Sequence, residues 1–480
     1  MKSTNNQRIL NGLGIALLIL GTVGCSVPRL AQKTENRSVP ASYSNSLDSA
    51  NSAQVRWQAF FTDPNLIALI DTALRNNQEL NITLQEIEMS RNEVSARQGE
   101  YRPFVGIGGG PGIEKTPRYT RLGAAEEASE IKPGRKVPDP LPDFRVAAYA
   151  RWEVDIWHKL RNARQAAVYR YLASVEGKNF MVTNLVAEIA NSYYELLALD
   201  TQLDILRRNI EIQTNALKIV QLEKEATRVT ELAVRRFQAQ VLNTQNLQYD
   251  IQQKIVETEN RINFLLGRYP QPIVRDHQNF EKLVPAAIQA GLPAQLLENR
   301  PDVRQAEQEL AAARLDIQVA RANFYPSLGI SASLGVQAFN PVYLATLPES
   351  LLASLVGDLA GPVVNKNAIK ATYANANARQ IQAVYQYERT LLNAYMEVVN
   401  QLSKISNLEK SYGVKANEVQ ALNESITISN RLFSSARADY MEVLLTQRDA
   451  LESRFDLVET KMQQMNAMVN VYRALGGGWK

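Results

Sequence analysis

The chain has 480 residues, of which 45% are hydrophobic and 21% are charged, and its formal net charge is +4. This composition excludes a disordered chain and a protein built from many apolar membrane helices, and so mild a charge predicts no nucleic-acid partner. The single cysteine excludes an intramolecular disulfide, and with only two histidines we expect no structural zinc site.

The N-terminus predicts a secretory signal peptide over residues 1–24. Lys2 and Arg8 precede an apolar run from Ile9 to Leu20, and small residues follow it. A basic start, a short apolar core and small residues before a cleavage point are typical of such a signal. The apolar run is too short to span a bilayer comfortably as a helix.

The only cysteine of the chain, Cys25, follows this signal directly. The pair Gly24-Cys25 resembles a bacterial lipobox, although Thr22 stands where such motifs usually carry leucine. We therefore expect cleavage before Cys25 and acylation of this residue, with a generic secretory signal as the alternative. By the same resemblance, Ser26 favours the outer membrane, and several acyl chains would anchor the protein stably.

The sequence contains two copies of one unit, with a period a little over 200 residues. Three short motifs recur in the same order, so each copy should fold in the same way. The pairs are Glu100–Ile107 with Ala322–Ile330, Asn191–Glu195 with Asn393–Glu397, and Asn263–Gly267 with Tyr472–Gly476.

Each copy predicts two strands, in residues 103–156 and residues 326–362. Apolar and other residues alternate from Phe144 to Glu153 and from Leu328 to Val336, which indicates strands with two unlike faces. The stretch Phe104–Ile113 follows a proline and reads as a strand, and Leu351–Leu359 reads as a strand or a helix. The charged, proline-rich stretch Glu114–Pro142 should be an exposed outer loop.

Strands of about ten residues suit a tilted crossing of a bilayer. Four strands cannot close a membrane barrel, and open sheet edges cannot lie in lipid. Several chains must therefore contribute, and three chains of four strands would give a plausible twelve-stranded barrel. The sequence thus predicts a homotrimer in contact with outer-membrane lipid.

Between and after the strands, residues 157–267 and 363–475 predict two hairpins of very long helices. Apolar residues recur every seven positions without a proline, as in the seam of a coiled coil. A run of about 70 helical residues would reach about 105 Å. The seam residues are Val182, Ile189, Leu196, Leu203, Ile210 and Leu217 in the first copy, and Val384, Leu391, Val398, Ile405, Tyr412, Val419, Ile426 and Phe433 in the second.

Five motifs in order resemble the TolC-like outer membrane factors of tripartite RND-type efflux systems. The resemblance covers about residues 50 to 478. It implies a mainly helical fold with a β membrane segment, in which a trimer forms an outer-membrane β-barrel and a periplasmic α-barrel. The motifs are Trp57–Leu66, Asn299–Glu307, Ala322–Pro326, Val229–Val234 and Ala438–Val443.

The resemblance also divides the chain into segments. We expect the signal peptide at 1–24, an acylated and equatorial segment at 25–60, α-barrel helices at 61–102, strands one and two at 103–156, and the first long hairpin at 157–267. An equatorial linker at 268–300, a helix at 301–325, strands three and four at 326–362, the second long hairpin at 363–475 and an equatorial end at 476–480 should follow.

The implied function is a passive exit channel, coupled through a periplasmic adaptor to an inner-membrane RND transporter. No catalytic, cofactor or metal site is expected, and no phosphate-binding loop that would supply energy is present in the sequence. A protein-secretion duct of type I and a coiled-coil scaffold lipoprotein without a pore are the alternatives. The sequence does not identify the cargo.

The candidate site residues lie at the turns of the two long hairpins, which converge and close the pore in this family. Glu442, Asp439 and Glu231 are the acids available for a cation-attracting ring at a constriction. Arg228 and Arg437 are the expected charge partners. The alternative is that these are ordinary solvated charges at helix ends.

Overall fold

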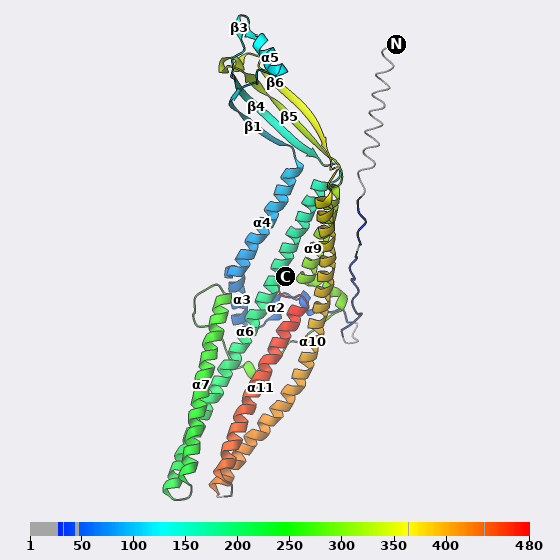
Figure 1. Cartoon of the computed structure of the whole chain (residues 1–480). Coiled ribbons are helices and arrows are strands. Elements are labelled where there is room, and N and C mark those ends of the chain that lie inside the picture. The colour runs from blue at the N-terminus through cyan, green and yellow to red at the C-terminus, as the bar shows by residue number, and fades with distance from the viewer. Residues whose placement is uncertain (1–26, 32, 44–47, 363, 436) are drawn as a thin grey trace. The chain divides into compact units, whose positions relative to one another are not determined.

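The computed structural model describes residues 27–31, 33–43, 48–362, 364–435 and 437–480 (Figure 1). The expected signal peptide and Cys25 lie outside these residues. The chain forms two compact units. The strand unit comprises Met1–Thr34, Glu88–Leu172 and Gln308–Tyr385, and the helix unit comprises Glu35–Ile87, Ala173–Glu307 and Gln386–Lys480.

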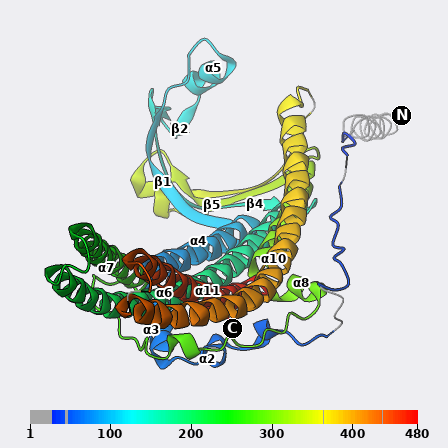
Figure 2. The same cartoon turned by 90° about the horizontal axis from the view of Figure 1, so that it is seen from below.

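The strand unit contains one curved sheet of four antiparallel strands in the order β1-β4-β5-β6 (Figures 1 and 2). The strands are β1 (Phe104–Glu114), β4 (Leu141–Val154), β5 (Ser327–Ala338) and β6 (Leu351–Ala360). The strand predicted over Phe144–Glu153 is confirmed, and the ambiguous segment Leu351–Leu359 is a strand rather than a helix.

The two faces of this sheet differ sharply. Paired residues on neighbouring strands share a face, so the register assigns every side chain to one side. Most of the large exposed hydrophobic side chains of the sheet fall on one face: Val105, Ile107, Ile113, Val146, Leu334, Leu351, Leu355 and Leu359. The opposite face carries Arg145, Tyr149, Arg151, Ser331, Ser333 and Ser354, among glycines.

The connection between β1 and β4 is more ordered than the expected outer loop. It contains helix α5 (Arg121–Ala128) and a small hairpin of β2 (Glu130–Lys132) and β3 (Arg135–Lys136). The Nζ atom of Lys132 lies 3.8 Å from the ring centre of Tyr343, in the 3-10 helix η4 (Pro341–Ala345). This cation–π contact joins the two loops at the same end of the sheet.

Four long helices form two hairpins of nearly equal length. Helices α6 (Lys159–Glu225) and α7 (Glu231–Leu265) have 67 and 35 residues, while α10 (Asn367–Ser434) and α11 (Tyr440–Ala474) have 68 and 35. Helix α6 begins in the strand unit and continues into the helix unit, as does α10. The expected tandem repeat and the expected helix length of about 70 residues are thus confirmed.

Shorter helices complete the two units. They are α2 (Trp57–Phe60), α3 (Pro64–Asn76), α4 (Gln78–Tyr101), α8 (Leu296–Asn299) and α9 (Pro301–Ala322), with 3-10 turns η1 (Ser52–Gln54), η2 (Phe280–Lys282) and η3 (Pro293–Gln295). In the part of the chain that the structure describes, no helix combines the length and apolarity needed to cross a membrane.

The core of the helix unit forms where the long helices pack on α3. Ile189 and Leu196 of the predicted seam are fully buried there, together with Leu66 and Ile70 of α3. Helix α3 starts at Pro64 because Asp63 caps it: the Asp63 carboxylate accepts from the Asn65 backbone N–H at 2.8 Å. Tyr193 of α6 donates its hydroxyl to the same carboxylate at 2.7 Å.

Candidate functional site at the helix-hairpin tips

The predicted gate residues lie at the two turns that join the long helices of the helix unit. Glu231 is the first residue of α7, Asp439 is the N-cap residue of α11, and Glu442 lies in the first turn of α11. All three are exposed. The positive end of each helix dipole favours acids at these positions, whatever else they do.

Glu231 is held by two cations of its own hairpin. Lys224 Nζ lies 2.5 Å from its carboxylate and Arg235 Nε lies 2.8 Å away. The hydrogen bond from Lys224 is the main reason that the pKa of Glu231 is lowered from its ordinary value. Lys224 was not expected as a partner, because it contacts Glu231 only after the chain has reversed direction.

A shallow hollow at the tips contains residues from both turns. Its lining includes Arg228 of the first turn and Asp439 of the second, so the structure brings together one predicted cation and one predicted acid. Among the described residues, neither Arg228 nor Arg437 has an acid within ion-pair distance in the single chain. The hollow is lined by Glu223, Arg228, Val229, Thr230, Phe433, Ser434, Ala438, Asp439 and Tyr440.

The first turn contains a strained residue. Thr227 has a φ of 60°, in the left-handed region that glycine usually occupies at the end of a helix. Around it, Thr227 N–H donates to the Lys224 carbonyl at 2.8 Å and Arg228 N–H donates to the Glu223 carbonyl at 2.9 Å. The turn therefore keeps a glycine-type geometry with a β-branched residue, which costs free energy.

Behind the turns, both hairpins pack together through a small apolar cluster. Val220, Ala233, Val234 and Phe237 of the first hairpin are buried, as are residues of the second. This cluster fixes the two turns side by side and therefore sets which charges face the hollow. The residues of the second hairpin are Val443 and Leu444.

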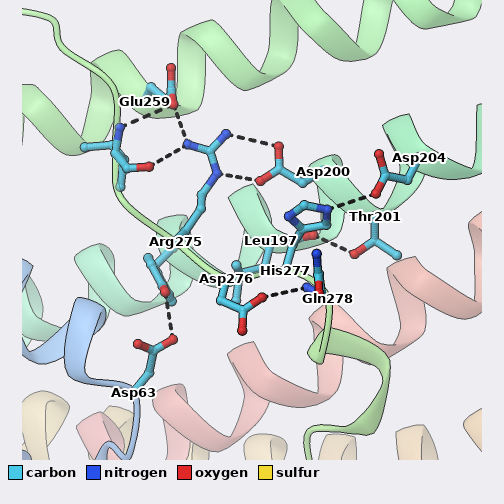
Figure 3. A network of polar contacts seen from close by, with 12 residues as sticks. Asp63, Leu197, Asp200, Thr201, Asp204, Glu259, Arg275, Asp276, His277 and Gln278 are labelled. Carbon is cyan, nitrogen blue, oxygen red and sulfur yellow. Dashed lines mark hydrogen bonds and ion pairs between the residues drawn. The ribbon is translucent and has the colours of Figure 1, made fainter. Parts of the chain in front are cut away.

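A second cluster of polar side chains connects the linker that follows α7, residues 268–300, to the long helices (Figure 3). The Arg275 guanidinium contacts Asp200 of α6 at 2.5 and 3.0 Å and forms an ion pair with Glu259 of α7. All three side chains are at most 20% exposed. Burial alone would lower the pKa of Arg275, but the two carboxylates raise it above its ordinary value.

The same linker makes another contact two residues later. His277 Nε2 lies 2.9 Å from the Asp204 carboxylate, one helical turn beyond Asp200 (Figure 3). The linker thus bridges α6 and α7 at one end and follows α6 at the other. Sequence reasoning missed this network because its members are separated by up to 75 residues and belong to no motif.

Arg300, in the motif Asn299–Glu307, is buried and lies just before α9. It donates to Asp302 at 2.6 Å, to Glu397 of α10 at 2.8 Å and to the Ala474 carbonyl at 2.9 Å. It therefore ties the start of the second copy to the end of α11. In the described ranges, no group of three or more Cys, His, Asp or Glu side chains could hold a metal ion.

Comparison with known families decides the identity. The family model described as outer membrane efflux protein matches residues 69–268 and 292–477, which is most of the chain. The chain belongs to the outer membrane efflux protein family.

Relatives and solved structures agree with the family. The chain is 27% identical to the pyoverdine export outer membrane protein OpmQ of Pseudomonas aeruginosa, over 97% of this chain and 96% of that protein. It is 25% identical to the cation efflux system protein CusC of Escherichia coli, over 96% and 97%. A crystal structure of a membrane protein from Pseudomonas aeruginosa covers 94% of this chain and 99% of its own, with a TM-score of 0.83 and 24% identity.

This efflux channel lies in the outer membrane and extends into the periplasm. It is a passive channel and not an enzyme. The features of the site fit that role, because fixed charges at a tip can select or block solutes without any reaction.

Replacing Arg275 with Gln should loosen the linker of this efflux channel. Two partly buried carboxylates would lose their common partner, which costs about 3 kcal/mol. Hydrogen exchange read by mass spectrometry should become faster over residues 268–283. Arg261→Gln, which removes a more exposed pair with Glu195, is the control and should cost about 1 kcal/mol or less. Equal exchange in both variants would contradict a clamping role for Arg275.

Replacing Thr227 with Gly should relieve the strain at the first tip. We expect the turn to gain about 1 kcal/mol, since glycine adopts a positive φ without a steric cost. Amide exchange over residues 222–234 should become slower. Thr227→Ala keeps the strain and should not slow exchange, so a slowing in both variants would assign the effect to the lost hydroxyl group instead.

Proposed function

We propose that this chain is the outer-membrane exit duct of a tripartite efflux pump and works as a homotrimer. In this proposal it receives cargo from an inner-membrane RND transporter through a periplasmic adaptor. One observation carries the proposal: a four-stranded sheet with an apolar face, a polar face and two unpaired edges, at β1 and β6.

The edges require partners because unpaired backbone N–H and C=O groups are too costly in lipid. Among the described residues, the outer edges of β1 and β6 have no neighbouring strand, so each can pair with a strand of another copy. Three chains of four strands supply twelve strands, enough for a closed barrel. The apolar face would then meet lipid and the polar face would line the pore.

Apolar residues that lie exposed along the long helices support the same arrangement of three chains in a ring. On α7, Leu242, Tyr249 and Val256 recur at intervals of seven and are 57%, 68% and 48% exposed. On α10, Val414 and Ile428 lie fourteen residues apart and are 68% and 56% exposed. Seven-residue apolar stripes left open on a helix fit packing against a helix of another copy.

The contacts of Ala31 and Lys33 with α10 support the proposal that Cys25 is acylated. The Asn377 side chain donates to the Ala31 carbonyl at 3.0 Å, and the Gln380 side chain donates to the Lys33 carbonyl at 3.0 Å. Asn377 lies about 15 Å along α10 from Asn367, where the helix begins after β6. The two contacts show that the segment from Lys33 back to Ala31 follows α10 toward the strands. We propose that acyl chains on Cys25 enter the membrane at that end of the unit.

The proposal names the cargo by its general class. The relatives are named for pyoverdine export and for cation efflux, so one architecture serves unlike cargos. We infer that this duct conducts small toxic compounds, such as drugs or metal ions, that its pump selects.

A bilayer experiment tests the proposed function. The protein should resist extraction from outer membranes by salt and alkali, as a barrel does, and the detergent-purified protein should open discrete conducting pores in planar bilayers. Release by alkali together with an absence of conductance would favour a coiled-coil scaffold without a pore.

The tip acids are proposed as the periplasmic gate. Asp439 and Glu442 are the stronger candidates, because Glu231 is already neutralised by Lys224 and Arg235. Arg228 is the proposed partner of Asp439, with which it shares the hollow, and Arg437 could meet an acid of a neighbouring copy.

Replacing Asp439 and Glu442 together with Ala should change the single-channel conductance about twofold or more and weaken the preference for cations, since a ring of like charges is removed. Glu452→Ala, an exposed acid further along α11, is the control and should leave both unchanged. If the double variant conducts like the wild type, these acids are not at the gate.

A further inference from the structure

The polar face of the sheet has a pocket at the end nearest the helices. Phe104 of β1, Arg151 of β4 and Ser331 of β5 line it in one row of the register. Arg102, just before β1, and Asp358 of β6 also line it, as do the acids Glu100 and Glu153. All of these residues belong to the strand unit.

Only some of the charged residues that line this pocket have an ion-pair partner. Glu153, which also lines it, is paired with Lys159, and Glu100 is paired with Arg97 at 3.1 Å. Within the described chain, neither Arg102 nor Arg151 has an acid within 4 Å. Two guanidinium groups without an acid partner therefore line the same hollow, together with Asp358 and the two acids that other cations already neutralise. An unpaired guanidinium fork favours a carboxylate or a sulfonate.

Aromatic rings lie beside these cations. Phe104 is 61% exposed, which is unusual on a polar face, and its ring centre lies 6.1 Å from that of Tyr149. The Tyr149 ring lies over Gly106: a Cβ atom there would come within 2.8 Å of the ring. The guanidinium of Arg151 lies 6.0 Å from the ring centre of Tyr149. The glycine thus lets the tyrosine lie flat and place aromatic surface next to Arg151.

We propose that this pocket is a binding site for a small organic anion that carries an aromatic ring. The anionic group would accept from Arg151 and Arg102, with the Ser331 hydroxyl as a further donor, and the ring would stack on Phe104. The inference rests on the proposed function, in which the polar face lines the pore. Each of three copies would offer one such site, and weak binding there would let the cargo leave again.

The strand itself provides a matched control. Arg145 lies on the same face of β4, six residues and about 20 Å from Arg151, and it does not line the pocket. Arg151→Gln and Arg145→Gln remove the same charge from the same face. A general electrostatic attraction would weaken equally in both variants, whereas a built site would weaken only in Arg151→Gln.

The test uses the ¹⁹F NMR line width of 4-(trifluoromethyl)benzoate with the detergent-purified full chain, which does not depend on an open tip. Trifluoroacetate serves as an anion without a ring, and 4-(trifluoromethyl)benzamide as a ring without a charge. We expect broadening of the benzoate with the wild type and with Arg145→Gln, and a reduction by about threefold or more in Arg151→Gln. The two comparison probes should broaden little.

Two outcomes would overturn the inference: equal broadening in all three proteins, or equal broadening by trifluoroacetate. Circular dichroism and light scattering on the same samples show whether each variant is folded and trimeric. A trimer that does not bind the benzoate would contradict the site alone, whereas a monomeric wild type would contradict the proposed function.

Discussion

The unpaired edges of the strand sheet constrain the rest of this molecule. Water can satisfy the free backbone groups of β1 and β6, but lipid cannot. At the same time, one face of the sheet exposes eight large apolar side chains that lipid would cover. These two features conflict in a single chain, and the proposed trimer reconciles them because the edges of neighbouring chains would pair. The apolar stripes on α7 and α10 are likewise exposed to water in a single chain, and a helix of a neighbouring copy would cover them.

Buried ion pairs hold the long helices of the helix unit beside its main apolar core. The linker after α7 contacts α6 and α7 through Arg275, and Arg300 joins the start of α9 to α10 and α11. Such pairs add little net stability, but breaking one leaves an uncompensated charge, so they fix the geometry strongly. Among the described residues of the tips, the ion pairs are those of Glu231, and they are exposed to solvent. Motion at the tips is therefore easier than motion at the linker.

Much of the fold could be predicted because it repeats along the sequence. The alternation from Phe144 to Glu153 predicted β4, and the seven-residue spacing through Ile189 and Leu196 predicted a helix whose seam is buried. The helix α5 inside the expected loop was missed, since eight residues without an apolar stripe leave no periodic signal.

The site was predictable only in part. The motif at each turn located Glu231, Asp439 and Glu442, but their partners depend on how the chain returns after the turn. Lys224 therefore could not be identified as the partner of Glu231, nor could the left-handed conformation of Thr227 be anticipated. The contacts of Arg275 and the pocket at Arg151 join residues far apart in the sequence, which no local pattern reports.

The most direct test of the central claim is the mass of the detergent-extracted particle, measured by native mass spectrometry. The account predicts one species with three chains, which persists when the detergent concentration is raised. A stable particle with one chain would show that the sheet edges are satisfied without neighbours, and would contradict the account.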